Sequence, residues 1–361
     1  MERAVMRHCK WAIVLIFVVL VYVSASREAV PFPAQFGGRY VGKMPGFGAV
    51  SVDFFDQPLW GLDSNPDDKE MWVYHDGKGD PESISIKQIG NDYFGEAVEV
   101  DSTDDSFVTN ATMRFYFSTS GAVAHGLIGK GTNTPTLPFE LKREFSNLSV
   151  KQTSKAAKRS FYGQVPLLPD DSAFRRALKQ RMVELMAAEA QTFTTGDLQL
   201  YWERLRGFGF AGSGLQEWQT RLLNESVASF AVRNYRDYGS SCGNLTSWES
   251  RTYSWRNNQL CELRLADFFQ ANSAWEVEIR SFCHSELIRR KLELSALNIL
   301  NPVVRLDIFT LSPTGIQIYI NPYEIASGAE GEFIFHIPYE RLKKFYKTDW
   351  PTSLLPITQL Q

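Results

Sequence analysis

The chain has 361 residues, of which 44% are hydrophobic and 22% are charged, and its formal net charge is −3. This composition excludes a disordered chain and leaves room for more than one hydrophobic core. Residues 1–25 carry a net +2, so a chain without them would carry −5. A mildly acidic chain argues against a nucleic-acid partner, because that binding depends on clustered Lys and Arg.

Residues 1–25 have the three parts of a secretory signal peptide. Arg3, Arg7 and Lys10 form the positive start, residues 11–23 are apolar, and residues 23–25 (Val-Ser-Ala) form the small-residue cleavage site. The apolar run is shorter than the roughly 18 residues of a spanning helix. We therefore predict export to the periplasm or the extracellular space. If the segment stayed uncleaved, it would anchor the chain to the membrane by its N-terminus.

Three cysteines follow the signal segment: Cys242, Cys261 and Cys283. An odd number in an oxidising compartment predicts one disulfide and one thiol, and we favour Cys242 paired with either Cys261 or Cys283. Four N-glycosylation sequons, which only a eukaryotic pathway would use, are expected in exposed loops at Asn110, Asn147, Asn224 and Asn244.

Residues 39–145 predict an all-β domain, a meander folded into a small barrel or sandwich. Short apolar runs recur about every ten residues between Gly, Asp, Asn and Pro, and their alternation buries one face. These runs include Val50 and Val52, Trp72 to Tyr74, Ile84 and Ile86, Met113 to Phe117, and Phe139 with Leu141. The polar, basic residues 146–160 predict a linker.

Residues 160–346 predict an α+β domain with two helices on an antiparallel sheet. One helix should follow a cap at Asp170-Asp171, and the other should open at the capping box Ser273–Glu276 and run to about Leu297. The expected buried positions are Phe174, Leu178, Met182, Leu185 and Met186 in the first helix, and Trp275, Ile279, Phe282, Cys283 and Leu287 in the second.

The rest of this half predicts strands and turns. Strands are expected at 226–238, at 247–255, in a hairpin over 304–320 that turns at Ser312–Gly315, and at 333–337, with a glycine-rich loop at 207–214.

The sequence contains no recognisable catalytic or metal-binding motif. The histidines stand apart without HxxxH, HExxH or CxxC spacing, at His75, His125, His284 and His336. Cys283 and His284 would point about 100° apart on a helix and cannot form a dyad, and Ser213 has no GxSxG context. We therefore predict no catalytic residue, no metal and no cofactor, although two carboxylates distant in sequence could still meet in space, as glycosidases require.

The segment Phe309–Ala326, with Gly331 and Ile337–Tyr339, resembles the extracytoplasmic domain of RsiV-type lysozyme-sensing anti-sigma factors. The same domain occurs beside PdaC-type peptidoglycan deacetylase modules. The shared pattern is a strand, a turn with Gly, a second strand, Tyr-Glu-Ile-Ala, a loop with Gly, and Ile-Pro-Tyr. Leu263–Phe269 resembles the strand end before the family's second helix. The resemblance covers about 225–346 and extends back toward 160, while Gly126–Leu141 is similar to a small β domain that often precedes this module.

The resemblance implies a binding surface on loop 322–331, with Tyr323, Glu324, Ser327 and Gly328 as candidate contact residues. The alternative is a structural role, with Tyr323 buried and Glu324 holding loop amides. Ser-Gly-Ala at 327–329 replaces the family's common Pro-Tyr-Ala, and Ser-Cys-Gly-Asn at 241–244 replaces Gly-Gly-Ala-His. Both changes bear on lysozyme recognition rather than on the fold. Sensor members carry a cytoplasmic segment before their membrane helix, and without it we expect no anti-sigma activity.

Three hypotheses about function follow. The first is an exported, non-catalytic envelope module that binds a lysozyme-like hydrolase or a cell-wall component such as peptidoglycan. The second is a hydrolase of cell wall or another glycan, whose site would unite two carboxylates, or a carboxylate and a histidine, in an aromatic-lined cleft. The third is a structural envelope protein without a soluble ligand.

Overall fold

The computed structural model describes residues 33–45, 48–55, 68–75, 82–89, 92–101, 108–119, 122–130, 136–154, 159–195, 212–237, 244–289, 306–322, 324 and 332–347. The predicted signal segment lies outside these ranges. Among the helices within them, none is long and apolar enough to cross a membrane.

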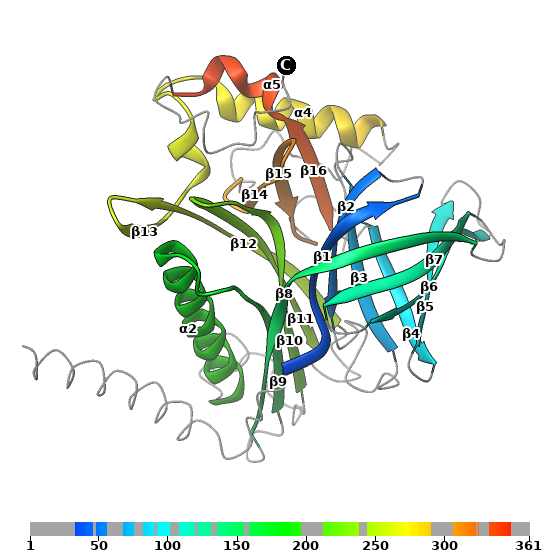
Figure 1. Cartoon of the computed structure of the whole chain (residues 1–361). Helices are drawn as coiled ribbons and strands as arrows, with labels where there is room; N and C mark the ends of the chain where they lie inside the picture. The colour runs from blue at the N-terminus through cyan, green and yellow to red at the C-terminus, as the bar shows by residue number, and fades with distance from the viewer. Residues whose placement is uncertain are drawn as a thin grey trace, which may run out of the picture.

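Thirteen strands form one continuous sheet in which neighbours along the chain are neighbours in space (Figure 1). All pairings are antiparallel except that of β9 with β10. The strands are β1 (Pro33–Met44), β2 (Gly48–Phe55), β3 (Asp68–His75), β4 (Glu82–Ile89), β5 (Asp92–Asp101), β6 (Val108–Thr119), β7 (Val123–Lys130), β8 (Leu137–Ser154), β9 (Arg159–Leu167), β10 (Gly212–Leu223), β11 (Val227–Asp237), β12 (Asn244–Arg256) and β13 (Gln259–Glu262).

Strands β1 to β8 form a closed ring, because β1 pairs with both β2 and β8. Alternate residues of the described strands are buried, among them Tyr40, Val52 and Leu141. Tyr40 packs edge-on against Phe54, with 5.0 Å between ring centroids. The predicted strands are therefore confirmed, and they close on themselves instead of stacking as two sheets.

The ring is not set apart as a separate all-β domain, because β8 continues beyond it. The first part of β8 pairs with β7, and the part from Ser146 to Ser154 pairs with β9. The predicted linker at 146–160 is therefore wrong. Two of its polar residues are buried: the Asn147 amide donates to the Phe54 carbonyl at 3.2 Å, and Ser149 accepts the Tyr162 hydroxyl at 3.1 Å. The structure is thus of a mixed α+β class, with most strands in one large sheet.

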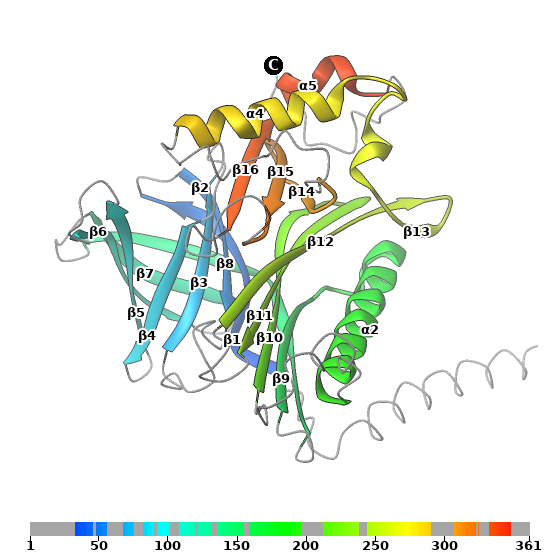
Figure 2. The same cartoon turned by 180° about the vertical axis from the view of Figure 1, so that it is seen from behind.

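The second half of the chain adds three helices and a small sheet to the described structure. The small sheet has the order β14 (Phe309–Leu311), β15 (Gly315–Ile320) and β16 (Phe333–Pro338). Helix α2 (Ala173–Thr195) covers one face of β9–β13, and the small sheet lies on the other face beneath α4 (Trp275–Arg289), as Figures 1 and 2 show. Shorter elements are η2 (Leu265–Phe268), α5 (Tyr339–Leu342) and η5 (Lys343–Phe345).

Helix α2 is capped by Ser172, one residue after the predicted Asp170-Asp171 cap. The Ser172 hydroxyl accepts the Arg175 backbone N–H at 3.1 Å, while the Asp171 carboxylate pairs with the Arg175 side chain at 2.8 Å. The predicted buried residues pack on the sheet, and Leu185 is only partly buried. Gly163 of β9 lets the helix pack closely, because a Cβ at that position would lie 2.8 Å from the Met186 sulfur and would force that side chain to shift.

The small sheet attaches to the large sheet through backbone groups of its edge strand. The N–H groups of Phe309 and Leu311 donate to the hydroxyls of Ser250 and Ser229 at 2.9 and 2.8 Å. An edge strand buried without such partners would leave unpaired donors, each costing about 1–3 kcal/mol. Two hydroxyls on β11 and β12 therefore replace a neighbouring strand.

Several helix and strand boundaries differ from the predicted ones. Gly212–Gly214 begin β10 instead of ending a loop, and the first hairpin strand starts only at Phe309. The predicted buried stripe of α4 is confirmed for Ile279, Cys283 and Leu287, while Trp275 and Phe282 are only partly buried. However, the helix begins at Trp275, so Ser273 lies one residue before the N-cap position, and its hydroxyl donates to the Gln270 carbonyl at 2.8 Å. Residues 290–297 lie outside the described residues.

The sequons do not all lie in exposed loops as expected. Asn110, Asn147 and Asn244 belong to strands, and Asn147 is buried. Asn224 lies in the β10–β11 turn, where its side-chain oxygen accepts the N–H groups of Ser226 and Val227 at 3.0 and 2.8 Å.

The predicted disulfide is not present in the structure. Neither Cys261 nor Cys283 is part of a disulfide, and Cys283 is fully buried in the core beneath α4. Cys242 lies outside the described residues.

A buried ion pair joins the ring to the second half of the chain. Strand β9 pairs with β10 only as far as Glu217, and beyond that point the outward backbone groups of Thr220 meet β1 and β2. The Asp53 carboxylate accepts the Thr220 N–H at 3.2 Å, and the Arg39 guanidinium donates to the Thr220 carbonyl. Arg39 also lies 3.6 Å from Asp53 and 3.2 Å from Glu144. We call Arg39 and Asp53 the Thr220 clamp.

Removing one member of the clamp should destabilise the whole protein. We expect Asp53→Ala to lower the free energy of unfolding by about 3 kcal/mol, because it leaves a buried N–H and a buried guanidinium short of partners. Lys343→Ala, which breaks an exposed pair with Glu340, should change it by less than about 1 kcal/mol. Urea unfolding of residues 26–361 measures both, and equal effects would contradict the interpretation.

Candidate functional site

The residues that carry the family resemblance hold the fold together. The Asn321 amide bonds both backbone groups of Trp248 on β12, donating at 3.2 Å and accepting at 2.5 Å. The Trp248 and Tyr319 rings pack with centroids 5.1 Å apart. Asn321 therefore fixes the end of β15 against the large sheet.

Tyr339, at the end of the Ile-Pro-Tyr segment, fixes the β14–β15 turn. Its hydroxyl donates to the Ser312 carbonyl at 2.6 Å, and burial raises the pKa of this phenol well above its usual value. Gly315 of the same turn cannot carry a side chain, because a Cβ there would lie 2.4 Å from the Ile337 carbonyl oxygen.

Of the four candidate contact residues in loop 322–331, only Glu324 lies within the described residues. Its N–H donates to the Asn321 carbonyl at 3.2 Å, and its side chain is exposed. Tyr323, Ser327 and Gly328 lie outside the described residues. Glu324 thus marks where the chain reaches the surface after β15.

An open groove runs beside the first turn of α4. It measures about 690 Å³ and lies between β12–β13, η2, α4 and the segment that leads into β14. Its lining includes Trp275 and six charged side chains: Arg251, Arg264, Arg280, Glu262, Glu276 and Asp307. We call it the α4 groove. Because the groove has as many positive as negative groups, it suits a partner that presents both hydrogen-bond donors and acceptors.

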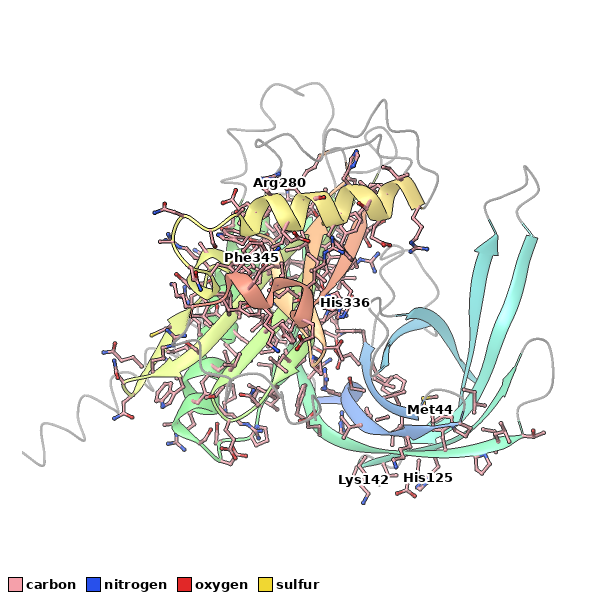
Figure 3. The ribbon with its side chains drawn as sticks, turned by 90° about the horizontal axis from the view of Figure 1, so that it is seen from above. Met44, His125, Lys142, Arg280, His336 and Phe345 are labelled. Atoms are coloured by element: carbon pink, nitrogen blue, oxygen red, sulfur yellow. The ribbon has the colours of Figure 1, made fainter. Side chains whose placement is uncertain are left out.

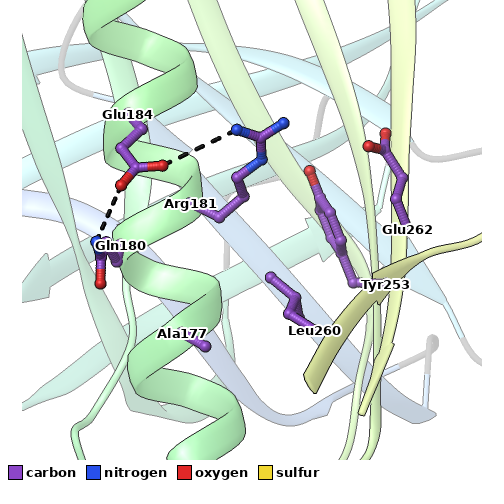
Figure 4. Close-up of a pocket in the computed structure, with 7 residues that line it drawn as sticks. All are labelled: Ala177, Gln180, Arg181, Glu184, Tyr253, Leu260 and Glu262. Atoms are coloured by element: carbon purple, nitrogen blue, oxygen red, sulfur yellow. Dashed lines mark hydrogen bonds and ion pairs between the residues drawn. The ribbon is translucent and has the colours of Figure 1, made fainter. Parts of the chain in front are cut away.

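A second, smaller hollow lies on the opposite side of the β12–β13 hairpin. This α2 pocket measures about 460 Å³ and is lined by Ala177, Gln180, Arg181, Glu184, Tyr253, Leu260 and Glu262 (Figure 4). Burial and nearby Glu262 raise the pKa of Tyr253 to about 12, while Arg251 and Arg181 act in the opposite direction. Its hydroxyl is therefore neutral at physiological pH.

Charged residues also occupy the buried face of β10 and β11, which sequence reasoning missed. Glu217, Arg221 and Arg233 are buried between the sheets. The Arg233 guanidinium lies 5.5 Å from the Trp248 ring and 3.5 Å from Glu332. Charges at alternate positions of a strand normally indicate a solvated face, so the sequence pattern predicted exposure where the structure has burial.

The histidines whose side chains are described do not form a common site. Figure 3 shows His125 on the ring and His336 in the second half, far apart. His125 lies 3.6 Å from Glu140, and His336 is 3.2 Å from the Thr314 hydroxyl. In the part of the chain that the structure describes, no three His, Cys, Asp or Glu residues are placed to hold a metal ion. Ser213 is buried at the start of β10.

Comparison with known proteins identifies a domain but no activity. Residues 266–340 match the family described as "Protein of unknown function (DUF3298)", so the chain contains a DUF3298 domain. No curated protein matches the chain.

Two crystal structures of DUF3298 family proteins are similar to the chain. One, from Bacteroides fragilis NCTC 9343, has 15% identity and a TM-score of 0.42 over 57% of this chain and 94% of its own. The other, from Pseudomonas aeruginosa PAO1, has 13% identity and a TM-score of 0.41 over the same shares.

His336, which is half-buried on β16, should make stability depend on pH. Burial lowers its pKa below the usual 6.5, so the folded protein binds this proton less readily than the unfolded chain. Its contribution to stability is therefore complete above pH 6.5 and is lost as the pH falls through the folded-state value. We expect denaturant unfolding to show a loss of up to about 1.4 kcal/mol per pH unit from this group.

His336→Gln should make that loss shallower. The exposed His125 provides the control, because His125→Gln should follow the wild type. The slope with pH is the readout, since His336→Gln also alters packing. If wild type and His336→Gln lose stability in parallel, His336 is not the responsible group.

Proposed function

We propose that this protein is an exported, non-catalytic binding protein of the cell envelope, with an RsiV-like domain that holds a partner protein through the α4 groove. Three observations support the proposal: the signal-like residues 1–25, the family signature near the C-terminus, and an open groove at the DUF3298 domain. Of these three observations, the groove gives the strongest support to the proposal.

The groove draws on both the matched domain and the large sheet. Trp275, Glu276 and Arg280 of α4 face the β12–β13 hairpin across it. Trp and Arg are the side chains that most often dominate the energy of protein interfaces. A partner entering here would bury an aromatic ring and a guanidinium together.

Loop 322–331 begins on the same side of the large sheet as the groove. Asn321 is bonded to Trp248, and Ser250, two residues further along β12, already lines the groove. Two residues of strand span about 7 Å, and residues two apart point to the same face. We therefore expect one partner to contact both the groove and the candidate residues Tyr323, Glu324, Ser327 and Gly328.

The partner that the resemblance suggests is a lysozyme-like hydrolase, or else a cell-wall component such as peptidoglycan. A chain that carries −5 after loss of residues 1–25 would attract a basic protein at long range. The balanced charges of the groove would then act at short range, where they orient the partner more than they add affinity.

The α2 pocket favours a second candidate, a hydrolase of cell-wall or other glycan. Two carboxylates, Glu184 and Glu262, line it together with Tyr253. Each already has an arginine neighbour, with Arg181 at 3.9 Å from Glu184 and Arg251 at 3.4 Å from Glu262. A general acid and a general base need different environments that shift their pKa values apart. Both carboxylates here have an arginine neighbour, so we favour binding over hydrolysis.

Calorimetric titration of residues 26–361 with a c-type lysozyme tests the proposal. We expect saturable binding at about micromolar affinity that persists at moderate salt, because screening weakens only exposed long-range attraction. Arg280→Glu in the groove should weaken it by about tenfold or more, since it opposes a charge in the contact. Release of soluble fragments from peptidoglycan should stay at background.

Arg289→Glu is the matched control, with the same change on the same helix at an exposed position. It should leave affinity within about twofold. Binding that disappears at moderate salt, or equal effects of the two variants, would exclude the groove as the site. Turnover of peptidoglycan would support the hydrolase instead.

A further inference from the structure

We propose that the α2 pocket binds a small zwitterion, the ammonium and carboxylate of a free α-amino acid. The pocket lies between α2 and the β12–β13 hairpin, on the opposite side of the hairpin from the α4 groove. Its volume of about 460 Å³ is within the range of about 300–1,000 Å³ common for small-molecule sites. The pocket opens on the α2 side of the hairpin and shares the residue Glu262 with the α4 groove.

Helix α2 supplies one charge of each sign. Arg181 and Glu184 are one turn apart, and their closest atoms are 3.9 Å apart. A tight pair of this kind would be about 2.7–2.9 Å, so the guanidinium has capacity to take a second carboxylate. The Gln180 amide donates to Glu184 at 2.9 Å and holds that carboxylate in place.

The hairpin supplies the floor and the second carboxylate. Asn257 and Asn258 adopt left-handed φ values of 51° and 59°, which form the tight turn that places Glu262 opposite Tyr253. The Tyr253 ring and Leu260 give the pocket an apolar base. Because Tyr253 is fully buried, this base is part of the rigid core under α2.

The arrangement of charges in the pocket favours a ligand that carries both a positive and a negative group. Figure 4 shows Arg181 reaching between Glu184 and the Tyr253 hydroxyl, with Glu262 on the far side of the ring. A carboxylate would be held by Arg181, an adjacent ammonium would face Glu184, and a small side chain would lie on Leu260. An anion alone would face two carboxylates, and a cation alone would face the guanidinium.

Titration of residues 26–361 with L-alanine, followed by two-dimensional amide NMR, tests the proposal. N-acetyl-L-alanine and L-alanine amide are the matched probes, since each lacks one of the two charges. We expect L-alanine to bind saturably below about 10 mM, and each blocked form to bind at least about tenfold more weakly. Equal binding of a blocked form, or no saturation by L-alanine up to about 10 mM, would overturn it.

The variants Arg181→Gln and Arg175→Gln distinguish an effect on the pocket from a general effect of removing a charge from α2. Arg175 pairs with Asp171 on the same helix and does not line the pocket. Arg181→Gln should weaken L-alanine binding by about tenfold, and Arg175→Gln should leave it within about twofold. Circular dichroism establishes that both variants are folded, and equal loss of binding in both would reject the site. Lysozyme is absent from this experiment, so its outcome is independent of the partner proposal.

Discussion

The backbone of Thr220 sets a constraint on which both halves of the molecule depend. Where β9 stops pairing with β10, the outward N–H and C=O of Thr220 are buried, and buried backbone groups must find partners. Asp53 and Arg39 supply them from β1 and β2, and Arg39, itself buried, is balanced by Asp53 and Glu144. The buried backbone of Thr220 requires Asp53 and Arg39, and the buried Arg39 in turn requires carboxylate partners. The clamp therefore fixes the ring against β10, and β8 joins the ring to β9 as one strand.

The same requirement explains the small sheet and the family signature. Hydroxyls of Ser229 and Ser250 take the N–H groups of β14, and Asn321 bonds the backbone of Trp248. Tyr339 closes the β14–β15 turn in the same way. These residues hold the fold, so their presence says little about what the protein binds. The surfaces proposed for binding are instead the α4 groove, the α2 pocket and loop 322–331.

Both hollows are built around the β12–β13 hairpin. Glu262 lines each of them, and its pairing with Arg251 at 3.4 Å connects their rims. Charges of both signs in concave, partly apolar surroundings favour recognition of polar partners over attraction of one charge type. A single short edge strand thus contributes to the larger groove on one side and the smaller pocket on the other.

Local patterns in the sequence were enough to predict most elements. Alternation placed β2, β11 and β16, and helical spacing placed α2 and α4, because burial on one face imposes a period that a sequence displays. The closure of β1 on β8, the clamp on Thr220 and the two hollows were decided only by tertiary structure. The linker prediction failed at Asn147 and Ser149 because polar residues in sequence suggest solvent, while here they satisfy buried partners. Arg181 and Glu262 line one pocket although they are 81 positions apart in the chain, and no local pattern predicts such a pairing of elements.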